Sequence, residues 1–84
     1  MSDVSLVKFF ELIIQSSTEE DSRNTAYQAL TRLRVLQAGR ADPKHVALLE
    51  AQLVEKASEL ATLFGMESST PMADRVREAI AHKP

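Results

Sequence analysis

Apolar residues recur every three or four positions along four segments of the chain, which is the spacing of one face of an α-helix. The pattern predicts helices at about 4–15, 18–38, 43–64 and 71–82. No segment alternates strictly between apolar and polar residues, as a half-buried strand would. We therefore expect an all-α fold, a small four-helix protein in which all 84 residues form a single domain.

The two longer segments, about 18–38 and 43–64, are separated by a loop of only a few residues. A loop that short makes two helices antiparallel neighbours. The expected architecture is thus a central antiparallel helical hairpin, with the segments at about 4–15 and 71–82 as short flanking helices.

Residues that favour helix boundaries occur at the expected starts. Asp3 is a candidate N-cap for the first helix, and Ser17-Thr18-Glu19-Glu20 has the form of a capping box. Asp42-Pro43 and Thr70-Pro71 each combine a capping side chain with a proline at the first helical position. These signals predict where the four helices begin.

Glycine marks the ends of the two longer segments. Gly39 and Gly65 follow their last periodic residues. Glycine adopts the left-handed conformation that commonly ends a helix without steric cost. We therefore expect the second helix to end at Ala38 and the third at Phe64.

The first helix is apolar around more of its circumference than packing on one side requires. Leu6, Phe10 and Ile13 form one stripe, whereas Phe9 falls toward another side. Either the hairpin buries this helix on most sides, or one side packs in the core and the other contacts a partner. Because a soluble monomer rarely exposes so much apolar surface, we predict that Leu6, Phe9, Phe10 and Ile13 belong to a protein interface.

The third helix has a second stripe, made of small residues three or four positions apart: Ala47, Ala51, Val54, Ser58 and Ala61. Small side chains allow another helix to approach closely. A flanking helix of the same chain could lie there, or a helix of another protein could dock. We include Ala47, Ala51, Val54 and Ala61 in the predicted interface. Leu48 and Val35 also fall off the main apolar stripes, which favours additional contacts.

Charge is distributed unevenly, although the net charge is only −2. The segment 23–44 is basic, and its cations are Arg23, Arg32, Arg34, Arg40 and Lys44. One hypothesis is that these residues follow nucleic-acid phosphates from a helix and its adjoining loop. The overall pI of about 5.6 argues against this, and so does the scarcity of aromatic residues interleaved with the cations, since Tyr27 is the single one in this segment. The preferred interpretation is a solvated basic face that pairs with acidic segments of the same or another chain.

Few residues could support catalysis or metal binding. The chain has no cysteine, which excludes disulfides and thiolate ligands. His45 and His82 lie in different predicted helices. Asp42-x-x-His45 could bind a metal from a first helical turn, but Asp42 is already accounted for as a cap. Two isolated glycines cannot form a phosphate-binding loop. We therefore expect no enzyme activity, no cofactor, no metal site and no small-molecule substrate.

The sequence also leads to expectations about where the protein is located and what it does. The longest apolar stretch, 6–14, is shorter than the ~20 residues that a membrane span needs. The absence of cysteine fits a cytoplasmic protein. The layout is similar to that of small bacterial secretion co-chaperones, phage-encoded inhibitors and regulatory adaptors, without a diagnostic motif of any of them. We predict a helical protein-interaction module, an adaptor, co-chaperone or regulator that associates with another protein or with itself as a homodimer.

Overall fold

The computed structural model describes residues 5–65 and 71–81. Within these ranges the elements are α1 (Leu6–Ser16), α2 (Glu20–Ala38), α3 (Pro43–Phe64) and α4 (Met72–Ala81). All the regular structure of the described residues is helical, so the all-α prediction is confirmed. The predicted helix bounds lie within two residues of the observed ones.

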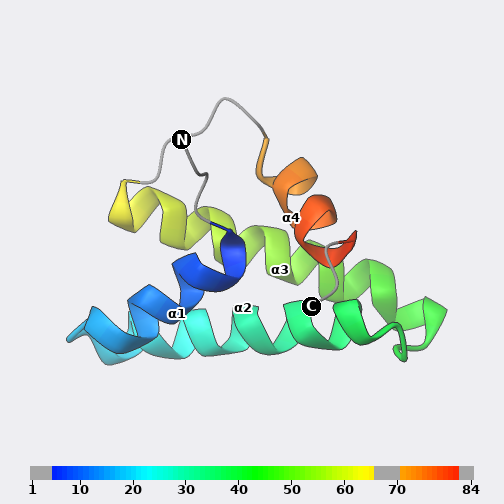
Figure 1. Cartoon of the computed structure of the whole chain (residues 1–84), viewed down its shortest axis with the longest axis horizontal. Helices are drawn as coiled ribbons and strands as arrows, with labels where there is room; N and C mark the ends of the chain where they lie inside the picture. The colour runs from blue at the N-terminus through cyan, green and yellow to red at the C-terminus, as the bar shows by residue number, and fades with distance from the viewer. Residues whose placement is uncertain (1–4, 66–70, 82–84) are drawn as a thin grey trace.

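The two longest helices, α2 and α3, lie side by side and run in opposite directions (Figure 1). The shorter helix α4 packs on both helices of this pair, α1 packs on α2, and α1 and α4 also contact each other. Of the two, α4 lies over the half near the α2–α3 loop, because Gln37 Nε2 donates a hydrogen bond of 2.8 Å to the Ala79 carbonyl. The helices thus form two layers, a hairpin below and two short helices over one of its faces.

The boundaries between α2 and α3 follow the sequence signals. Gly39 has a φ of 69°, in the left-handed region, and its N–H donates to the Leu36 carbonyl. The Asp42 carboxylate accepts a hydrogen bond of 2.9 Å from the Lys44 N–H, and Pro43 is the first residue of α3. Both predicted signals are therefore confirmed, and together they fix the turn of the hairpin.

The predicted capping box at 17–20 is wrong. The Ser17 N–H donates to the Ile13 carbonyl at 2.9 Å, so Ser17 still belongs to the end of α1. Its hydroxyl accepts from the Glu19 N–H at 3.2 Å, and Glu19 is the N-cap of α2 without a capping side-chain bond. Ser17 therefore lies two positions before the N-cap of α2. It cannot be that cap because it already ends α1.

The first helix also begins later than predicted. Ser5 is its N-cap, with the hydroxyl accepting from the Lys8 N–H at 3.2 Å. The predicted caps Asp3 and Thr70 and the loop at 67–69 lie outside the described residues.

The core draws on all four described helices. Its largest fully buried side chains are Phe10, Leu33, Leu53, Leu60 and Val76. Further core residues lie on the inner sides of α2 and α3: Ala26, Ala29, Leu30, Leu36 and Ala57. Every buried side-chain nitrogen or oxygen among the described residues has a hydrogen-bond partner. Packing is therefore achieved within one copy of the chain.

This packing corrects the interface predicted for the first helix. Leu6, Phe9, Phe10 and Ile13 are all buried in the core, with at most 8% of each side chain exposed. The Phe9 and Phe10 rings lie 5.8 Å apart. Successive residues point about 100° apart on a helix, and α1 is seated against both α2 and α4. One broad buried face therefore accommodates both rings, and these four side chains are not open to a partner.

Candidate interaction surface

One side of the hairpin is left uncovered by the described helices, and we call it the outer face. Gln37 and Glu50 bond to α4, which marks the inner side of α2 and α3. On nearly the opposite side of the same helices, Arg32 Nε donates to Gln52 Oε1 at 3.0 Å. The Arg32–Gln52 bond therefore lies on the outer face and sets the pairing of α2 with α3 there.

Three large apolar side chains lie on the outer face. Val35 follows Arg32 by one turn on α2, and Leu48 precedes Gln52 by one turn on α3. Since the helices are antiparallel, both lie next to each other on the loop side of the Arg32–Gln52 bond. Leu63 lies three turns beyond Gln52, toward the other end. The exposed fractions are 40% for Val35, 55% for Leu48 and 64% for Leu63.

Polar residues fill the remaining positions of the outer face at spacings of three and four: Asp21, Asn24 and Gln28 on α2, and His45, Glu55 and Glu59 on α3. Leu12, Tyr27 and Phe64 are also exposed, but they lie on other sides of their helices. Sequence reasoning singled out Val35 and Leu48 and missed Leu63. Leu63 could have been identified from the sequence, because it lies off the core stripe of α3. It is also four residues, about one helical turn, after Glu59 of the outer face.

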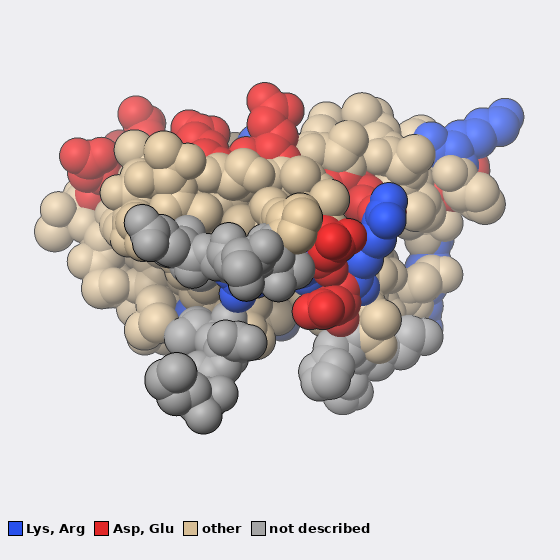
Figure 2. All heavy atoms as spheres, turned by 90° about the horizontal axis from the view of Figure 1, so that it is seen from above, with Lys and Arg blue, Asp and Glu red and all other residues tan. Residues whose placement is uncertain are grey.

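The two ends of the hairpin carry opposite charge. Arg40 and Lys44 are exposed at the end with the α2–α3 loop. Toward the other end Asp21 and Glu59 are exposed on the outer face, and Glu55 is exposed near the middle of α3. Figure 2 shows acidic side chains gathered over one end of the longest axis and a basic one extending from the other. The charges of the outer face are therefore segregated along its length.

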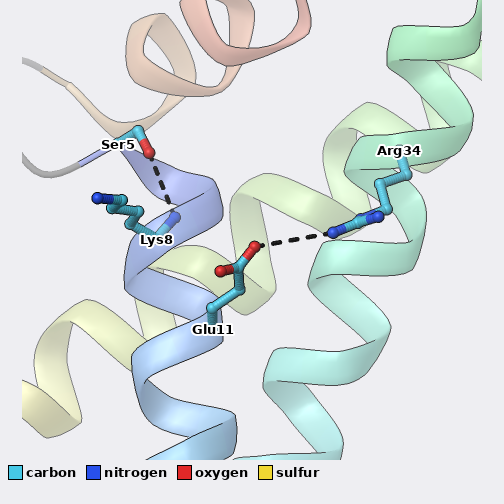
Figure 3. Close-up of polar contacts among 4 residues, drawn as sticks. All are labelled: Ser5, Lys8, Glu11 and Arg34. Carbon is cyan, nitrogen blue, oxygen red and sulfur yellow. Dashed lines mark hydrogen bonds and ion pairs between the residues drawn. The ribbon is translucent and has the colours of Figure 1, made fainter. Parts of the chain in front are cut away.

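The arginines proposed to follow nucleic acid do not form one surface. Arg34 points toward α1, where a guanidinium nitrogen lies 3.7 Å from Glu11 Oε1 (Figure 3). Arg32 points toward α3 and bonds to Gln52. Arg23 is half-buried near the start of α2, and Arg40 and Lys44 lie at the opposite end of that helix. The five cations are therefore not all directed to one side of the hairpin.

The small-residue stripe of α3 is only partly open. Ala47 and Ala51 are exposed, whereas Val54 and Ala61 are half-buried. Val54 packs against the core of the same chain. The exposed members are alanines, whose side chains are too small to anchor a partner as aromatic or large aliphatic residues do. The stripe is therefore a weaker candidate than the outer face.

The described residues offer little chemistry. They contain no group of three or more His, Cys, Asp or Glu side chains that could hold a metal ion. The Asp42 carboxylate is engaged as the cap of α3, and His45 is exposed. Across the described residues, we find no helix with the length and apolarity that crossing a membrane requires. The outer face is the feature that calls for a functional interpretation.

The chain matches no protein-family model, no curated protein and no solved structure in comparisons with all three.

Proposed function

We propose that this chain is a helical protein-interaction module, an adaptor or regulator that binds protein through the outer face of its α2–α3 hairpin. The observation that carries the proposal is the exposure of Val35, Leu48 and Leu63 on that face. The core is complete without them, so they are not needed to hold the described helices together.

Energetics support a reversible interaction. Burying a Val or Leu side chain contributes about 1.5–3 kcal/mol. Association costs at least ~4 kcal/mol in lost translational and rotational freedom. The exposed parts of three such side chains contribute roughly 2–5 kcal/mol, which is comparable with this minimum cost, and the charged residues around them add attraction, orientation and selectivity. A weak complex that forms and dissociates suits an adaptor or regulator.

The nucleic-acid alternative lacks comparable support. Its cations point to different sides of the hairpin, and Arg34 already pairs with an acidic residue of α1. Protein is thus the macromolecule that the exposed surface fits best.

Site-directed photo-cross-linking tests the proposal. We would place a photoreactive phenylalanine analogue at Leu48 and, as a matched control, at Ala73, which is exposed on α4. Each variant is expressed in the native host and irradiated, after circular dichroism has shown that both fold.

The expected result is a discrete protein adduct from position 48 that is absent from position 73. Replacing Val35 and Leu63 by serine in the position-48 variant should reduce that adduct strongly. The same adducts from both positions, or none from position 48, would overturn the proposal.

A further inference from the structure

The charge pattern of the outer face identifies what kind of surface it fits. At the loop end Arg40 and Lys44 are exposed, and together with Asp42, which keeps its charge as the cap of α3, they leave a net charge of +1 (two cations and one carboxylate). At the other end Asp21 and Glu59 are exposed on the same face. A partner that complements this face must carry acidic groups over one end and basic groups over the other. The outer face itself, turned end to end, has that distribution.

We propose that the outer face binds a second copy of this chain in an antiparallel orientation, with the loop end of each copy over the acidic end of the other. This rests on the proposed function, in which the outer face is a protein-binding surface, and names the partner. Figure 2, seen from above, shows acidic side chains over one end of the longest axis and a basic side chain extending from the other, with acidic and basic side chains next to each other between them.

Symmetry leaves two ways to place one such face on its copy, and charge selects between them. A two-fold axis along the helices would put the loop ends together, with Arg40 and Lys44 facing their own copies. A two-fold axis across the helices puts each loop end over the acidic end of the other copy. Like charges repel in the first arrangement and opposite charges attract in the second, so the antiparallel arrangement is favoured.

The apolar residues fit the same arrangement. A two-fold axis that crosses α3 at the middle of its 22 residues places Lys44 opposite Leu63, and Leu48 opposite Glu59. Leu48 of one copy and Leu63 of the other are then about one helical turn apart, as are Lys44 and Glu59. Long side chains on facing helices reach across that distance. The contact therefore has the polar residues Gln52 and Glu55 near its axis, and apolar and charged pairs together toward both of its ends.

The size of the face sets the expected strength. The molecule is 34 Å along its longest axis. Two adjacent helices about 10 Å wide and of that length present roughly 700 Å². Stable interfaces bury about 800 Å² per partner, so a reversible dimer with a dissociation constant in the micromolar range is expected.

Sedimentation of the purified full chain tests the association and its orientation. We would vary the protein from about 1 to 500 μM, at roughly 0.05 and 0.5 M NaCl, since salt screens contacts between exposed charges. The expected result is a monomer–dimer equilibrium whose dissociation constant rises about tenfold or more at the higher salt. A monomer at every concentration would overturn the proposal. Association that strengthens with salt would do so too, because it would indicate that like charges meet.

Charge reversal provides the matched variants. One variant carries Arg40→Glu and Lys44→Glu, which makes both ends of the outer face acidic. The other carries Asp21→Lys and Glu59→Lys, which makes both ends basic. All four residues are outside the core, and circular dichroism checks folding. Each variant alone should be monomeric at concentrations where the natural sequence is dimeric. An equimolar mixture should restore a dimer of one copy of each.

Two further results would overturn the pairing: a mixture that stays monomeric while both variants fold, or a variant that dimerises alone as tightly as the natural sequence. The outcome also separates this inference from the proposed function. A monomeric chain that still cross-links to a different protein from position 48 would refute self-association and leave the outer face as an interaction surface. A monomeric chain without any such adduct would refute both.

Discussion

Two faces of the same hairpin use the same kind of residue in opposite ways. On the inner side of α3, Leu53 and Leu60 are fully buried beneath the short helices. On its outer side, Leu48 and Leu63 are more than half exposed. Leu48 and Leu53 are only five positions apart, so neither composition nor local hydropathy distinguishes them. The position of each residue around the helix decides whether its neighbours are other core residues or solvent.

Single exposed leucines are common on soluble proteins, so exposure alone would have little meaning. On the outer face, Val35, Leu48 and Leu63 coincide with a segregation of acidic and basic residues along the same two helices. No comparable arrangement surrounds Leu12 on α1. This difference between two exposed apolar regions is what favours the outer face as a binding surface.

The largest effect is expected where a charge enters the inner side. Phe9→Glu places a carboxylate in the core, where burying an unpaired ion costs several kcal/mol. A chain of this size has about 4–13 kcal/mol of stability in total. We expect far-UV circular dichroism to show a largely unfolded chain. If the variant kept its helical signal and lost only its self-association, the placement of Phe9 in the core would be wrong.

Two leucine-to-alanine substitutions on α3 compare how much the inner and outer sides contribute to the free energy of unfolding. Leu53→Ala should lower the free energy of unfolding by about 2–5 kcal/mol, because it leaves a cavity in the core. Leu48→Ala, on the same helix, should change it by less than about 0.5 kcal/mol for the monomer. Urea denaturation of dilute protein gives both values. Equal losses would show that the two faces are not different in the way that their exposure indicates.

A smaller change tests the turn that holds both faces in place. Asp42→Ala removes the side chain that accepts from the Lys44 N–H, and should cost about 1 kcal/mol of stability. Since Asp42→Ala also removes a negative charge from the loop end that faces acidic residues of the other copy, the dissociation constant of the dimer should not rise above that of the natural sequence. Urea denaturation and sedimentation read the two quantities separately. A loss of dimer without a loss of stability would assign Asp42 to the interface instead.

Much of the fold could be predicted from sequence because its signals are local. Gly39 and the Asp42-Pro43 pair each fix a helix boundary through their own backbone and side-chain chemistry. The capping box at 17–20 failed for a physical reason. The same four residues also had to end α1, and the Ser17 N–H was already bonded to the Ile13 carbonyl.

The candidate site was harder to predict because burial depends on packing between helices. The apolar first helix suggested an interface, but α2 and α4 enclose Phe9 and Phe10 together. The Arg32–Gln52 bond indicates which sides of α2 and α3 face away from α1 and α4, and these sides form the outer face. Periodicity located Val35 and Leu48 off the core stripes, but not on a common surface.

Concentration-dependent NMR tests the central claim most directly, because it reports on every backbone amide of the natural sequence. We would compare ¹H–¹⁵N spectra of the chain at about 10 and 500 μM, a range that spans a micromolar dissociation constant. The account predicts shift changes along the outer face, at Val35, Leu48 and Leu63, while buried Leu33 and Val76 stay unchanged. Changes confined to exposed residues of α1 and α4, such as Lys8 and Ala73, or no change at all, would contradict it.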